Sequence, residues 1–79
     1  MKLWLLRPID RDKDPWEPWY DKCFGFVIRA EDEAKARSTA AQDAGDEGEQ
    51  AWLDASLSSC VELTADGEEG LVIMDFYSA

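Results

Sequence analysis

The amino-acid sequence predicts a single α+β domain, residues 1–79, in which one helix covers one face of a mostly antiparallel four-stranded sheet. The expected order is β-β-α-β-β. Three observations carry this prediction: four short segments have the composition of strands, one segment has helical spacing, and hairpin-like joins occur towards both ends. With 46% hydrophobic residues among 79, the chain can bury one small core.

The first half of the chain supplies two of the predicted strands. Residues 2–7 form a compact apolar run that ends at Pro8. Residues 8–21 contain three prolines and are expected to form a long loop, because proline cannot donate a hydrogen bond to a sheet. Residues 23–30 are rich in aromatic and β-branched side chains, so they are expected to form the second strand.

The second half supplies the helix and two further strands. Acids at the start of residues 31–44 suit a helix N-terminus. A stripe of small residues would let this helix lie close to the sheet, and its alanines are Ala30, Ala34, Ala41 and Ala44. Gly45 is a plausible helix stop, and residues 49–57 are expected to include a short turn that covers the core. Residues 59–64 alternate in polarity, residues 65–70 contain an Asp-Gly turn signal, and residues 71–77 complete the predicted sheet.

The charge of the chain is divided unevenly along its length. All eight basic residues lie within the first 37 positions, whereas residues 38–79 contain ten acids and no base, and the net charge is −10. Such a chain is attracted to positive partners and repelled by nucleic acid and by anionic lipid. We therefore expect the partner to be a basic DNA-binding protein surface, with no direct binding to nucleic acid or membrane.

The sequence favours no enzyme, no metal site and no cofactor. It contains no histidine, which removes the commonest general base and the usual zinc ligand. Asp10, Asp12 and Asp14 have the spacing of an EF-hand calcium loop, but Pro15 stands where that loop needs glycine. Cys23 and Cys60 are expected to be small buried side chains in a reducing compartment, and a disulfide between them stays open as an alternative.

Two features are candidate partner-binding surfaces. The acids after the helix and in the following turn can imitate the phosphates of DNA, or they can serve solubility alone. The tryptophans of the proline-rich loop can pack on the core or anchor a partner, since tryptophan dominates interface hot spots. The candidate residues are Asp43, Asp46, Glu47, Glu49, Glu62, Asp66, Glu68, Glu69, Trp16 and Trp19.

Several stretches resemble a family of small acidic phage and prophage proteins. They are MKLWLLRP (residues 1–8), PWYDKCFGFVIRA (18–30), WLD (52–54) and SCVELT (59–64). Among mobile-element proteins of this size and charge, the chain looks like an anti-CRISPR inhibitor of a type I system, with I-C as the suggested subtype. The resemblance implies an inhibitor that binds the DNA-recognising surface of a CRISPR surveillance complex and blocks access to the target or PAM. The apolar run at residues 3–6 is too short for a signal peptide, so we expect a cytoplasmic location, which with this resemblance would be the cytoplasm of the bacterial host. The alternative is a phage or host accessory protein that meets its partner through the tryptophan-rich loop.

Overall fold

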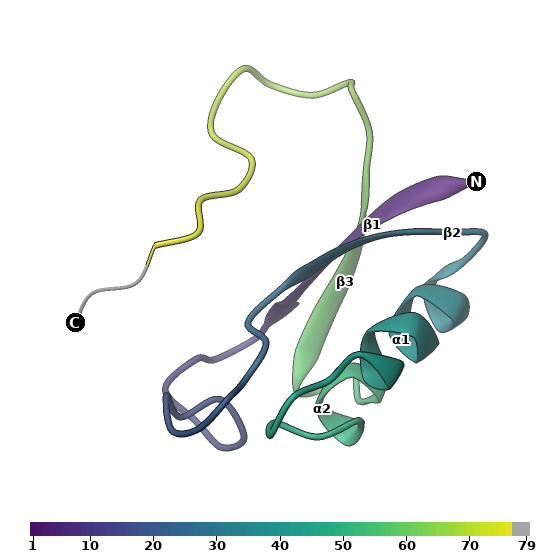
Figure 1. Ribbon diagram of the computed structural model, residues 1–79. Helices are drawn as coiled ribbons and strands as arrows, with labels where there is room; N and C mark the ends of the chain where they lie inside the picture. The colour runs from purple at the N-terminus through teal and green to yellow at the C-terminus, as the bar shows by residue number, and fades with distance from the viewer. Residues whose placement is uncertain (77–79) are drawn as a thin grey trace.

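A computed structural model describes residues 1–76 as a small α+β domain with a three-stranded antiparallel sheet and one main helix (Figure 1). The order along the chain is β-β-α-α-β, and the strand order in the sheet is β2-β1-β3. The elements are β1 (Lys2–Pro8), β2 (Phe26–Ala30), α1 (Glu33–Gln42), α2 (Gln50–Leu53) and β3 (Ser58–Leu63).

Strand β1 lies at the centre of the sheet and divides its two faces. Leu6 pairs with Phe26 on β2 and with Cys60 on β3, and these residues face the helices. Because side chains alternate along a strand, Leu5 lies on the opposite face. Both leucines are buried, but only Leu6 belongs to the main core. The sheet therefore has a second apolar face, turned away from α1.

The main core forms between the sheet and the two helices. Asp32 caps the N-terminus of α1, since its side chain accepts a hydrogen bond from the Lys35 amide at 2.9 Å. Small side chains on α1 face the core, but the predicted stripe is only partly right: Ala36, Ala40 and Ala41 are buried, whereas the predicted Ala34 is exposed. The main helix of the prediction is thus confirmed, with its ends at residues 33 and 42.

Two buried indole rings complete this core. The fully buried Trp52 of the one-turn helix α2 packs edge-on against Trp16 and Phe26, with ring centroids 4.9 Å away in each case. The guanidinium of Arg37 on α1 donates to the Trp52 carbonyl at 2.9 Å and to the Ser58 carbonyl at 3.1 Å. Arg37 therefore links α1 to α2 and β3 from inside the protein.

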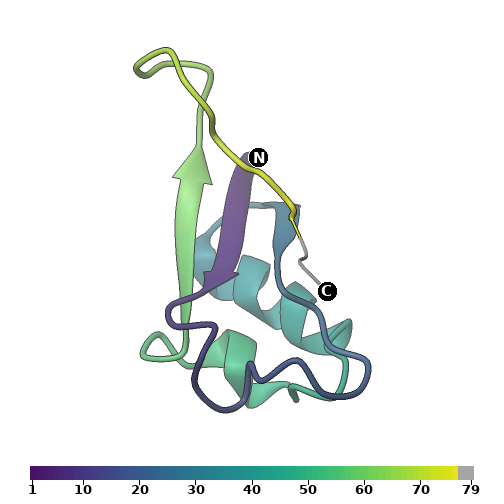
Figure 2. The ribbon, with the colours of Figure 1, turned by 90° about the vertical axis from the view of Figure 1, so that its left-hand side faces the viewer.

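The predicted fourth strand is wrong within the described residues. Residues 71–76 are irregular, and the end of the predicted strand, at residue 77, lies outside the described part of the chain. After β3, the chain passes Gly67 and Gly70, whose φ angles of 151° and 156° favour glycine. It then runs along the side of the sheet away from the helices rather than back beside β3 (Figures 1 and 2). The segment is apolar enough for a strand, but no strand edge receives it.

Within residues 1–76, neither helix has the length and apolar character needed to span a lipid bilayer.

Candidate partner-binding surface

A pair of hydrogen bonds joins the loop before β2 to the connection after α1. The Asp46 amide donates to the Asp21 carbonyl at 2.7 Å, and the Asp21 amide donates to the Asp46 carboxylate at 3.0 Å. Gly45 permits this contact, because a Cβ atom at this position would lie 2.3 Å from the Asp21 carbonyl oxygen. Two segments far apart in sequence therefore form one surface.

Glu47 braces the same two segments from within. One of its carboxylate oxygens accepts the Cys23 amide at 3.0 Å, and the other accepts the Trp52 indole N–H at 2.6 Å. The residue is only 6% exposed. Its prediction as a partner-binding residue is therefore corrected: the buried carboxylate stabilises the fold, since two good donors offset the cost of burial.

The two candidate tryptophans have opposite environments. Trp16 is 1% exposed and donates its indole N–H to the Leu57 carbonyl at 3.1 Å, so it belongs to the core and not to a partner-binding surface. Trp19 is 67% exposed, and the neighbouring Tyr20 is 89% exposed. Tyr20 also has a φ angle of 67°, a region that bulky residues rarely adopt. The loop thus buries one ring and presents two others to solvent.

We call the exposed aromatic and acidic side chains of these two joined segments the acidic–aromatic patch. All its members are exposed: Trp19, Tyr20, Asp21, Asp43, Asp46 and Glu49. Among the described residues, none of its carboxylates forms an ion pair. The nearest base in sequence, Lys22, donates its ammonium group to the carbonyls of Pro15 and Glu17, at 2.8 and 2.6 Å. The patch therefore combines unneutralised negative charge with two aromatic rings.

The remaining candidate acids lie elsewhere on the molecule. Glu62 on β3 forms an ion pair with Lys2 at 3.6 Å, while Asp66, Glu68 and Glu69 are exposed in the turn after β3. This turn and the connection after α1 lie at opposite ends of the fold in both ribbon views (Figures 1 and 2). The acids predicted as partner-binding residues thus form two separate groups rather than one face.

Other candidate chemistry receives little support from the geometry. No group of three possible metal-binding side chains occurs among residues 1–76. Asp10 instead accepts a hydrogen bond from the Asp12 amide at 3.0 Å, as in an ordinary polar turn.

Both cysteines are free thiols, so the disulfide alternative is not realised. Burial and the charge of Glu47 raise the pKa of the Cys23 thiol, and burial together with Glu33 raises that of Cys60. Both side chains therefore remain protonated well into the alkaline range.

Comparison with protein-family models, curated proteins and solved structures finds no match to this chain. Sequence reasoning did not select Tyr20 or Asp21 as members of the site. The sequence pointed to this part of the loop only through their neighbour Trp19, which was among the predicted residues. Their proximity to Asp46 depends on the fold and could not be read from spacing.

Proposed function

We propose that the protein is a binding inhibitor whose acidic–aromatic patch docks on a basic, DNA-recognising surface of its partner and competes with DNA. The observation that carries this proposal is the reciprocal hydrogen bonding between Asp21 and Asp46. It joins the loop that carries the exposed Trp19 and Tyr20 to the connection that carries Asp46. Such a surface has both the charge and the anchoring side chains that a protein interface needs.

The negative charge of the patch suits a surface that binds phosphates. Asp43, Asp46 and Glu49 are held on backbone that α1, α2 and the buried Glu47 brace. Carboxylates fixed in this way can meet Lys and Arg side chains without the entropy cost of ordering a flexible tail. Electrostatic steering would also speed the encounter, and the effect should weaken as salt increases.

The aromatic pair supplies what charge alone lacks. Exposed carboxylates contribute mainly to the association rate and to specificity, whereas buried Trp and Tyr side chains dominate hot-spot energies. Trp19 and Tyr20 stand next to Asp21 in sequence, so the rings and the charges can reach one partner together. We expect the rings to fill a pocket beside the partner's basic groove.

The proposed partner is a type I CRISPR surveillance complex, in accordance with the resemblance to small phage proteins. This complex binds duplex DNA through basic surfaces that read the target and the PAM, which is the chemistry the patch would engage. No cofactor is required, because the proposed activity is occupation of a surface. No catalytic step is proposed.

A pull-down of the tagged protein against purified type I surveillance complexes tests this proposal. The expected result is capture of a complex by the wild-type chain and reduced capture after preincubation with target DNA. The variant Asp43→Lys/Asp46→Lys/Glu49→Lys should lose capture. Capture that persists in this variant, or that is unchanged by preincubation of the complex with target DNA, would contradict the proposal.

A second candidate function follows from the exposure of Trp19 and Tyr20. In that case the chain is an accessory protein whose partner binds the two rings, and its acids serve solubility. Trp19→Ala would then cost more affinity than the triple acid reversal, and the affinity would change little with salt. Measurement of both variants at two salt concentrations separates the two candidates.

A further inference from the structure

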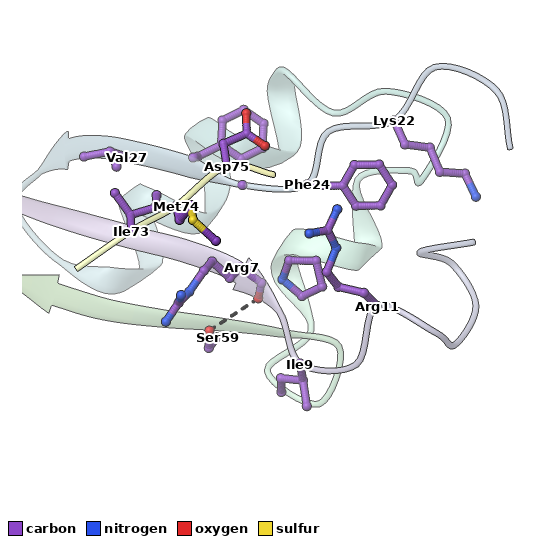
Figure 3. A pocket seen from close by; sticks show the side chains of 13 residues that line it. Arg7, Ile9, Arg11, Lys22, Phe24, Val27, Ser59, Ile73, Met74 and Asp75 are labelled. Carbon is purple, nitrogen blue, oxygen red and sulfur yellow. Dashed lines mark hydrogen bonds between the residues drawn. The ribbon is translucent and has the colours of Figure 1, made fainter. Parts of the chain in front are cut away.

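A groove of about 760 Å³ opens on the side of the sheet away from α1, between β2, the loop after β1 and the C-terminal segment (Figure 3). This volume lies within the range of roughly 300–1,000 Å³ that is usual for binding sites. Three bases line the groove, Arg7, Arg11 and Lys22, against one acid, Asp75. The groove is therefore locally basic on a protein whose net charge is −10.

The basic side chains of the groove are not neutralised by the protein itself. Within residues 1–76, none of Arg7, Arg11 and Lys22 forms an ion pair with a carboxylate. The guanidinium of Arg11 instead lies over the Phe24 ring, 4.6 Å from its centroid, as Figure 3 shows. Phe24 and Val27 add apolar surface beside these charges. A ligand that fits would carry acids next to apolar side chains.

One exposed segment of the chain has this composition. In residues 66–72, the acids Glu68 and Glu69 precede Leu71 and Val72, which are 77% and 61% exposed. This segment extends beyond the end of β3 (Figure 1). Its one hydrogen bond among the described residues is local, from the Thr64 hydroxyl to the carbonyl of residue 66 at 3.1 Å. The segment is thus free to contact another molecule.

We propose that the groove binds residues 66–72 of a second copy of this protein, and that the contact is reciprocal in a two-fold dimer. In this dimer, Glu68 and Glu69 of each copy lie against Arg7 and Arg11 of the other. The apolar side chains of the segment then cover Phe24 and its surroundings, which shields apolar surface that one copy leaves in water. Two-fold symmetry forms the same contact twice.

This inference is independent of the proposed function. The acidic–aromatic patch lies at the end of the fold opposite the turn (Figures 1 and 2). None of its residues lines the groove, although Lys22 of the groove follows Asp21 of the patch in sequence. Self-association is measured without any partner. The patch variant Asp43→Lys/Asp46→Lys/Glu49→Lys should therefore dimerise like the wild type, even if it loses its partner.

Sedimentation equilibrium over micromolar to millimolar concentrations tests the dimer. The wild-type mass should rise from the monomer value of 8.9 kDa towards twice that value. Arg7→Glu/Arg11→Glu and Glu68→Lys/Glu69→Lys should each weaken association by about tenfold or more, because like charges then face each other. An equimolar mixture of the two variants should associate again, since each contact in the mixed dimer pairs opposite charges.

The variant Lys13→Glu/Lys35→Glu is the matched control. It changes the net charge by the same amount as the groove variant, but neither of its residues lines the groove. It should associate like the wild type. A wild-type chain that stays monomeric throughout, or two charge variants that fail to associate when mixed, would overturn the proposal. Circular dichroism of each variant confirms that the mixing experiment compares folded proteins.

Discussion

Replacement of Glu47 by glutamine is the sharpest test of how the loop before β2 is held against α2 and the connection after α1. The carboxylate of Glu47 accepts hydrogen bonds from the Cys23 amide and the Trp52 indole, at 3.0 and 2.6 Å, in an environment only 6% exposed. A glutamine amide offers one oxygen and one NH₂ group, so it can accept only one of these bonds well. The remaining donor, either the Cys23 amide or the Trp52 indole N–H, then faces the glutamine NH₂ group, which is itself a donor.

The cost of Glu47→Gln follows from these two bonds. Hydrogen bonds to charged groups contribute roughly 1.5–3 kcal/mol each, and a buried donor without a partner costs roughly 1–3 kcal/mol. Removal of one negative charge from a chain with net charge −10 offsets part of this loss. We expect the free energy of unfolding to fall by about 3 kcal/mol, which for a domain of this size lowers Tm by more than about 10 °C.

Urea and thermal unfolding, followed by tryptophan fluorescence and circular dichroism, measure this effect. Glu49→Gln is the matched control, because it makes the same chemical change two residues later on an exposed side chain. It should change the free energy of unfolding by less than about 0.5 kcal/mol. Equal stability of the two variants would refute the structural role of Glu47.

Two further predictions concern the same region. Gly45→Ala should destabilise the domain by about 2 kcal/mol in urea unfolding, because the added methyl group meets the Asp21 carbonyl, whereas Gly25→Ala meets its nearest atom at 3.4 Å and should cost less. Raised thiol pKa values mean that Cys23 and Cys60 alkylate slowly at pH 8. Because the folded state favours the protonated thiol, the raised pKa also contributes to the free energy of unfolding. This contribution is fully present below the ordinary pKa of 9.0 and is lost as pH rises through the pKa of the folded state. Equal stability of the two glycine variants, or alkylation at the rate of an unfolded control, would contradict these expectations.

The local parts of the fold could be predicted from the sequence. The initial acids and the alanine-rich composition predict the helix α1, although the alanines that it buries, Ala36, Ala40 and Ala41, differ in part from the predicted stripe. The predicted strands at residues 2–7, 23–30 and 59–64 correspond to β1, β2 and β3, although β2 begins only at Phe26. The prediction of a fourth strand failed at residues 71–76 because it rested on composition, which reports only how well a segment suits a strand. Composition does not report the path of the chain after β3, which carries residues 71–76 along the side of the sheet away from the helices although the outer edge of β3 is unpaired within residues 1–76.

The candidate site was harder to predict, since the surroundings of a side chain depend on tertiary contacts. Trp16 and Trp19 occur in similar proline-rich contexts, yet one is in the core and the other is exposed. Glu47 belongs to an acidic run that suggests an exposed surface, but the buried Trp52 indole needs an acceptor and finds it there. The contact of Asp21 with Asp46 joins positions 25 residues apart and leaves no local signal.

The most direct test of the proposed function is displacement of labelled target duplex from a type I surveillance complex by increasing amounts of this protein. The wild-type chain should displace the DNA, and Asp43→Lys/Asp46→Lys/Glu49→Lys should not. Asp66→Lys/Glu68→Lys/Glu69→Lys makes the same change in charge at the opposite end of the fold, and it should still displace the DNA. Equal loss in both variants would show that total charge, rather than the acidic–aromatic patch, is responsible. Retention of DNA in the presence of the wild-type chain would contradict the proposed competition itself.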